Sequence, residues 1–145
     1  MQFMWADTLL ALERAHLVRL ALWGGACLLV GATMLGVLRL RRASSSLLDH
    51  FAIQTLAWGG IDLALALAGL QRLAPRDLAG ATRLDRFLWL NIGLDAGYVM
   101  VGLTLFLVGW RVLRRLGVVG AGLAVIVQGT ALALLDLVLA SQISR

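Results

Sequence analysis

Three aspartates stand inside long apolar stretches of the sequence, at positions where a carboxylate is costly. They are Asp62, Asp95 and Asp136. On insertion scales a central aspartate costs about 2.5–3.5 kcal/mol, so three facing lipid would cost roughly 8–10 kcal/mol. We therefore expect the three carboxyls to face polar partners inside a helical bundle, where they could bind a proton or a cation.

Spacing predicts that these carboxyls lie at one depth. Each aspartate is nine residues from a polar residue at one end of its segment, namely Gln71, Arg86 or Arg145. Nine helical residues span about 13 Å, so the carboxyls should form a layer nearer the side that carries both termini. Arg19 lies about 4.5 Å shallower than this layer when the two halves of the chain are aligned. We expect Arg19 to pair with at least one aspartate.

Other polar and aromatic side chains share helix faces with the aspartates at 100° per residue. Hydrogen bonds from them could satisfy the carboxyls, or they could serve only as interhelical hydrogen bonds worth about 0.6–2 kcal/mol each. Three acids against one arginine leave two negative charges uncompensated, which favours a bound proton, a cation or water. The supporting residues are Gln54, Trp58, Asn91, Tyr98 and Gln128.

Four apolar segments must position these side chains. About 20 helical residues cover a hydrocarbon core of about 30 Å, and each segment reaches that length. The only proline, Pro75, lies in the polar connection between the second and third segments. The sequence therefore predicts an all-α fold, a four-transmembrane-helix bundle forming a single domain over residues 1–145. The expected spans are residues 17–38, 51–70, 87–110 and 117–140.

Capping patterns predict where the helices begin. Ser46 with Asp49, and Thr82 with Asp85, have the spacing of a capping box before the second and third spans. Before the first span, a short interfacial helical lead-in is expected to begin at Asp7 and Thr8 and to run into that span.

Glycine and histidine positions suggest packing rather than ligand binding. Gly93 and Gly97 have GxxxG spacing, which is typical of close helix contacts. His16 and His50 lie near opposite ends of the spans and cannot share a metal. We interpret His16 as a surface or capping residue.

An internal repeat is suggested by comparing the halves. Gln54 and Asp62 recur as Gln128 and Asp136 at a displacement of 74, while Gly24 and Gly36 match Gly97 and Gly109 at a displacement of 73. The pattern predicts two tandem two-helix repeats in parallel orientation. The proposed units are residues 17–70 and 87–140.

Composition supports the membrane interpretation and excludes several functions. The 145 residues are 61% hydrophobic and 14% charged, with a mean hydropathy of +0.89, against roughly 25% charged in ordinary globular chains. All 13 basic residues are arginines flanking apolar runs, which is typical of membrane-flanking charge and not of nucleic-acid binding. The lone Cys27 excludes a dithiol pair within the chain. We expect no enzymatic activity, cofactor or metal site, because no catalytic triad, ligand spacing or phosphate loop is present.

The arginine distribution leaves membrane orientation open. Six arginines lie in the first and third loops and seven on the opposite side. Their density in the short loops favours placing those loops in the cytoplasm, but the balanced count also allows both orientations. We expect a multi-pass protein of the bacterial inner (cytoplasmic) membrane with both termini on the same side.

The third segment carries Asn91, Gly93, Leu94, Asp95, Tyr98 and Gly102, and the fourth carries Gly120, Gly122, Ala124, Val125, Gln128, Gly129 and Asp136. In these residues, over about half of the chain, the sequence resembles an uncharacterised family of small four-helix bacterial membrane proteins. The resemblance implies the fold and supplies no activity.

Two functional hypotheses follow. In the first, Asp62, Asp95 and Asp136, balanced by Arg19, bind a proton or cation and couple it to transport or permeation of a small solute. In the second, the chain is a non-catalytic structural or partner-binding membrane subunit. The expected partners are the lipid bilayer and either a second copy of the chain or another membrane subunit, with no nucleic acid.

Overall fold

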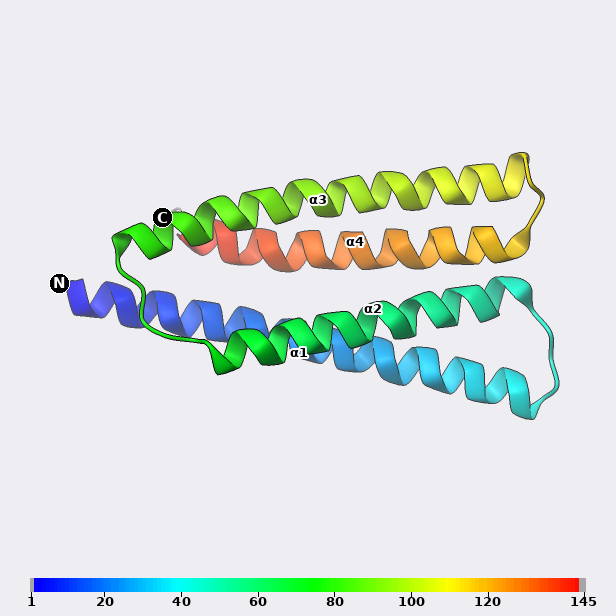
Figure 1. Ribbon diagram of the computed structural model, residues 1–145, viewed down its shortest axis with the longest axis horizontal. Helices are drawn as coiled ribbons and strands as arrows, with labels where there is room; N and C mark the ends of the chain where they lie inside the picture. Colours follow the sequence, from blue (N-terminus) through cyan, green and yellow to red (C-terminus); the bar gives the residue numbers. More distant parts are fainter. Residues whose placement is uncertain (1, 144–145) are drawn as a thin grey trace.

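Four long helices make up the protein, as the computed structural model of residues 2–143 shows, with side chains described from residue 5 onward (Figure 1). All four are long and apolar enough to cross a membrane, and each predicted span lies within one of them. The all-α four-helix prediction is therefore confirmed, while Arg145 lies outside the described residues. The helices are α1 (Gln2–Leu40), α2 (Ser46–Gln71), α3 (Leu78–Arg111) and α4 (Leu116–Ile143).

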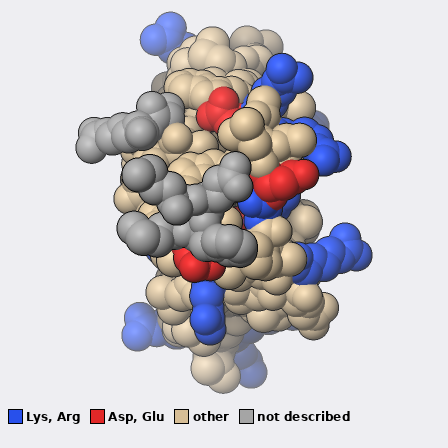
Figure 2. Space-filling view, turned by 90° about the vertical axis from the view of Figure 1, so that its left-hand side faces the viewer, with Lys and Arg blue, Asp and Glu red and all other residues tan. Residues whose placement is uncertain are grey.

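The helices form two antiparallel hairpins, α1–α2 and α3–α4, which pack along α4. Helix α4 contacts all three others, whereas the backbone of α3 packs closely on α4 alone within the described part of the chain. Both short turns lie at one end of the bundle, and the α2–α3 connection lies at the other with the described chain ends (Figure 1). Arginines project around this second end, among fewer acidic residues (Figure 2).

Glycines allow the two helices of the first hairpin to touch through their backbones. A Cβ on Gly59 would lie 2.7 Å from the carbonyl oxygen of Gly24, and a Cβ on Gly24 would lie 2.8 Å from that of Gly59. One heptad along α1, a Cβ on Gly31 would meet the Ala52 carbonyl oxygen at 2.8 Å. Small residues at seven-residue spacing therefore set the α1–α2 distance.

The second hairpin uses the same arrangement, but on α3 the GxxxG pair Gly93 and Gly97 is not the contact. A Cβ on Gly102 would lie 2.8 Å from the carbonyl oxygen of Gly122, and one on Gly129 would lie 2.9 Å from that of Asp95. By contrast, a Cβ on Gly93 or Gly97 would meet nothing within 4 Å. The GxxxG prediction for packing within this chain is wrong, because these two glycines face outward.

The helix starts also differ from the capping predictions. Ser45, one residue before α2, accepts a hydrogen bond from the Leu48 amide at 3.4 Å. Helix α3 begins four residues before Thr82, because Asp77 accepts from the Gly80 amide at 2.7 Å. Asp77 has the extended backbone of an N-cap. It lies two residues after Pro75, so α3 begins directly after the proline-containing connection. Helix α1 already contains Asp7 and Thr8, so the lead-in is continuous with the first span.

Replacing Asp77 with alanine should therefore lower the free energy of unfolding by about 1 kcal/mol, because the first turn of α3 loses its side-chain acceptor. Thermal or denaturant unfolding in detergent measures the change. Asp7→Ala is the matched control, since exposed Asp7 lies inside α1 and caps no helix. Equal losses in both variants would contradict the capping role.

The structure does not support the proposed sequence repeat beyond the tandem order of two hairpins. The alignment pairs Gly24, which contacts α2, with Gly97, which is open; it also pairs open Gly36 with Gly109, where a Cβ would lie 2.9 Å from the Val119 amide nitrogen. In the observed register, Gly24 faces Gly59 and Gly102 faces Gly122. The aligned glycines therefore do not have equivalent surroundings.

Candidate functional site

The three aspartates lie together in the interior, one each from α2, α3 and α4. Asp62, Asp95 and Asp136 are 2%, 5% and 8% exposed. Asp62 acts electrostatically on Asp95, and Asp95 acts on Asp136. These three buried carboxyls, linked pairwise by electrostatic effects, are called the carboxylate layer below.

Asp62 is held by an amide that also bridges to α1. The Gln128 side-chain nitrogen donates to Asp62 Oδ2, and the Trp23 indole nitrogen donates to Gln128 Oε1 at 3.1 Å. Because Gln128 is 5% exposed, its donor and acceptor both need partners, and this chain supplies them. The three side chains link α1, α4 and α2 through one path of hydrogen bonds.

Asp136 has a partner that the sequence interpretation missed. His16 Nε2 lies 3.3 Å from Asp136 Oδ1, and His16 is 7% exposed. Asn91 of α3 also acts on the same carboxyl through its side chain. The interpretation of His16 as a surface or capping residue is wrong. Helical spacing could have indicated this role, since His16 shares a face of α1 with Arg19 and Trp23.

Asp95 is the least satisfied of the three. Its Oδ2 atom is buried and has no hydrogen-bond partner within the described part of the chain. Its backbone carbonyl lies against Gly129, so α4 passes closely behind it. A buried carboxylate oxygen without a donor is strongly disfavoured. A bound proton, a cation or water would each remove that penalty.

Arg19 does not pair with the carboxylate layer. It is exposed, and no carboxylate lies within ion-pair distance of it among residues 5–143. Its charge still acts on His16, one turn earlier in α1. A compact imidazole fits between closely packed helices, whereas a guanidinium on a long stem keeps its hydration by extending outward. His16, and not the predicted Arg19, contacts the carboxylate layer from α1.

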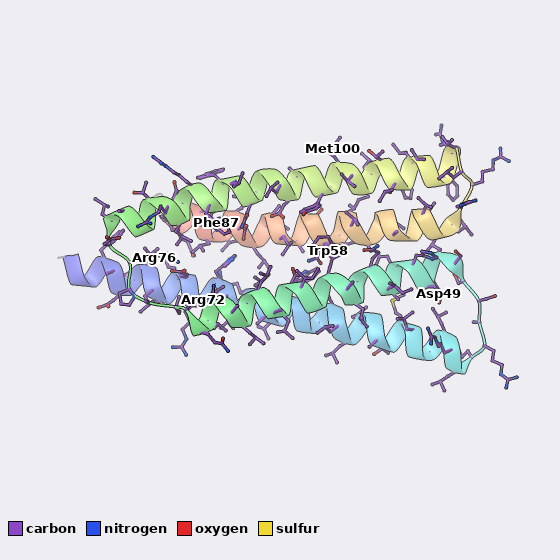
Figure 3. All side chains as sticks on the ribbon, in the orientation of Figure 1. Asp49, Trp58, Arg72, Arg76, Phe87 and Met100 are labelled. Carbon is purple, nitrogen blue, oxygen red and sulfur yellow. The ribbon has the colours of Figure 1, made fainter. Side chains whose placement is uncertain are left out.

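Of the remaining predicted residues, Trp58 and Tyr98 form a contact between helices, whereas Gln54 does not contact the aspartates. The rings of Trp58 and Tyr98 meet edge to face, with centroids 5.4 Å apart and planes at 68°. This contact joins α2 to α3, whose backbones do not approach closely, and Figure 3 places Trp58 on α2 in the middle of the bundle. Gln54 is half-buried and makes no described hydrogen bond to an aspartate.

A second polar pair lies toward the end with the termini. Arg76, in the α2–α3 connection, donates through Nε to Glu13 Oε2 at 2.9 Å and through Nη2 to Glu13 Oε1 at 2.5 Å. Glu13 is 8% exposed, and its hydrogen bond raises the pKa of the Arg76 guanidinium above the ordinary value. Figure 3 shows Arg76 beside α1. No spacing pattern in the sequence indicated this ion pair, because Glu13 and Arg76 lie 63 positions apart.

Together these contacts form a polar series extending from the connection into the bundle. Glu13 and His16 are one helical turn apart on α1, and His16 leads to Asp136, then Asp95 and Asp62. Within residues 5–143, no three His, Cys, Asp or Glu side chains are grouped closely enough to hold one metal ion. The arrangement therefore suits groups that bind protons separately better than a multidentate metal cage.

Comparison with known proteins gives a family without an assigned activity. No curated protein and no solved structure matches the chain. A family model described as a family of unknown function matches residues 19–137, a range that includes Trp23, Gln128 and the carboxylate layer but begins after Glu13 and His16. This agrees with the resemblance to an uncharacterised family. Because the match covers most of the sequence, the chain belongs to the family of unknown function DUF6992.

Proposed function

We propose that the protein is a small membrane transporter that binds protons at its carboxylate layer and couples them to the passage of a small solute. The observation that carries the proposal is the burial of Asp62, Asp95 and Asp136 within electrostatic reach of one another, with no arginine paired to them among the described residues. Such intramembrane acids commonly mark proton or ion pathways.

Charge balance supports this proposal. If all three carboxyls were ionised, a protonated His16 would compensate one of them and leave two buried negative charges. Burying an uncompensated charge costs several kcal/mol. Protons or a cation would remove that surplus, and reversible occupancy is what a coupled transporter requires.

The separate surroundings of the carboxyls favour protons over a single cation. Gln128 donates a hydrogen bond to Asp62, while His16 and Asn91 interact with the carboxyl of Asp136. Of these three aspartates, only Asp95 retains a buried oxygen without a partner among the described residues. In the proposed path, His16 receives a proton from the end with the termini and exchanges it with Asp136, and Asp95 lies between Asp136 and Asp62.

The proposed setting is the bacterial cytoplasmic membrane, and the proposed role is non-enzymatic. Four membrane-length helices put much of the chain in contact with lipid. Four crossings, with the described chain ends at one end of the bundle (Figure 1), support the proposal that both termini lie on the same side.

A proton-flux assay tests the proposal. The purified chain is placed in liposomes that contain a pH-sensitive dye, and a potassium gradient with valinomycin drives protons inward. Wild type is expected to acidify the lumen faster than protein-free liposomes. The triple variant Asp62→Asn, Asp95→Asn, Asp136→Asn should fall to the protein-free rate, because the amides cannot carry the exchangeable proton.

Asp7→Asn is the matched control, since it removes an exposed aspartate from α1 and should leave the flux unchanged. Circular dichroism and gel filtration establish that each variant is folded. Flux that persists in the folded triple variant would refute proton handling by this layer. Absence of any flux in wild type would favour the alternative below.

The alternative is a non-catalytic structural or partner-binding subunit. It is favoured by the Trp23, Gln128 and Asp62 hydrogen bonds, which join three helices and would stabilise the bundle without carrying anything. In that case the asparagine variants would lose thermal stability or assembly, and purified wild type would move no protons. The outward Gly93 and Gly97 would then be available to a second helix.

A further inference from the structure

The two short turns share a feature that the carboxylate layer does not explain. Each places an arginine in the left-handed backbone region, Arg42 with φ 49° and Arg114 with φ 50°. Glycine is the usual residue at such positions, because a side chain there is disfavoured. After α1, the Arg42 amide bonds to the Arg39 carbonyl and the Ala43 amide to the Leu38 carbonyl, which is the Schellman pattern. Both turns therefore carry an arginine at a position where glycine would adopt the backbone conformation at lower cost.

Each of these arginines lines a hollow together with a second arginine three residues earlier. In the α3–α4 turn, Arg111 and Arg114 line a hollow of about 410 Å³ with Trp110 and Leu116. In the α1–α2 turn, Arg39 and Arg42 line a hollow of about 430 Å³, beside Leu38 and Ile53. All four arginines are exposed. Two guanidinium groups beside an apolar wall suit a phosphate that carries an acyl chain.

We propose that each hollow binds the phosphate headgroup of an anionic phospholipid, with the arginine pair on the phosphate. The hollows lie where membrane-length helices end, which is the level of lipid headgroups. Trp110 and Leu116 are more than half exposed beside the arginines, so an acyl chain can lie against them. A soluble phosphate would make no use of that apolar wall.

The α3–α4 hollow should be the tighter of the two. Its described lining contains no carboxylate, whereas Asp49 lines the α1–α2 hollow and repels a phosphate. Leu116 is also the first residue of α4, and the positive end of a helix dipole favours an anion. Figure 3 shows Asp49 near the α1–α2 turn. Asp49→Asn should therefore increase lipid binding at this second hollow.

Lipid binding can be measured by native mass spectrometry of delipidated protein titrated with dioleoyl phosphatidylglycerol or dioleoyl phosphatidylcholine. Wild type should bind phosphatidylglycerol preferentially. Each arginine removed should weaken that binding about fivefold, from the contribution of one basic residue near an anionic lipid. Millimolar inorganic phosphate should not displace the lipid.

The decisive variant is Arg42→Gly with Arg114→Gly. Glycine suits the left-handed backbone, so the melting temperature should stay the same or rise while the preference for phosphatidylglycerol is lost. Arg39→Gln with Arg111→Gln removes the other pair without touching the turn residues and should also lose the preference. The matched control is Arg83→Gln with Arg86→Gln, which removes two exposed charges near the start of α3.

Three outcomes would overturn the proposal. The preference could survive in the glycine variant, which would mean that these arginines are not the site. It could fall equally in the Arg83 and Arg86 control, which would indicate only the overall positive charge. Displacement by inorganic phosphate alone would indicate a site for soluble anions.

Discussion

Replacing Gly122 with leucine is expected to destabilise the α3–α4 hairpin by about 3 kcal/mol or more, at the upper end of the overpacking range. A Cβ at this position would lie 2.6 Å from the Phe106 amide nitrogen and 2.7 Å from the Gly102 carbonyl oxygen. Both are backbone atoms of α3, so no rotamer change can relieve the overlap. The helices must move apart, and the carboxyls of Asp95 and Asp136, which belong to these same helices, would separate with them.

Gly97→Leu is the matched control, because it makes the same substitution on α3 where a Cβ meets nothing within 4 Å. Its stability should be unchanged or higher by up to about 1 kcal/mol, since leucine forms helix better than glycine. Unfolding of both variants in the same detergent, followed by circular dichroism, measures the difference. A loss in Gly97→Leu as large as that in Gly122→Leu would mean that the open face of α3 is itself packed in an assembly.

This pair of glycines also shows what sequence could and could not predict. Segment length and hydropathy predicted all four helices, because lipid requires a run of about 20 apolar residues whatever the packing. On α3, Gly102 and Gly109 share the helix face of Asp95 at seven-residue spacing, so the polar residues marked the side that meets α4. The GxxxG spacing of Gly93 and Gly97 pointed to the wrong side, because spacing alone does not say which face of an apolar helix meets a neighbour.

The sequence indicated which acids lie in the interior but not which groups contact them. Asp62, Asp95 and Asp136 stand in apolar segments, so burial against polar groups was expected, while their equal depth stays a prediction. Pairing depends on rotation about each axis and on side-chain reach. Arg19 has the right charge, yet His16 reaches Asp136 because its ring fits between packed helices. Likewise, Arg76 reaches Glu13 through a connection whose path the sequence does not specify.

Removing the imidazole at His16 should produce the second large effect. In His16→Ala, Asp136 keeps Asn91 on α3 but loses its contact with α1, and it still faces the charge of Asp95. A buried acceptor that loses its partner costs about 1–3 kcal/mol, and more when the acceptor is charged. Near neutral pH we therefore expect a loss of this size. His50→Ala is the control, because His50 is exposed near the opposite end and contacts the Ser46 carbonyl.

The sign of the pH dependence distinguishes a carboxylate left without its partner from a simple cavity. Protonation removes the charge of Asp136, so the deficit of His16→Ala relative to wild type should shrink as the pH falls from about 8 toward about 4. A cavity would cost the same at every pH. Glu13 and Arg19 also act on His16, so wild type must be measured at each pH and only the difference interpreted. The double variant His16→Ala, Asp136→Asn should recover much of the loss, because position 136 then no longer carries a carboxylate that lacks its α1 partner. A deficit that is independent of pH and is not recovered in the double variant would show that His16 only fills space, and the proposed proton path would then lack its entry through His16.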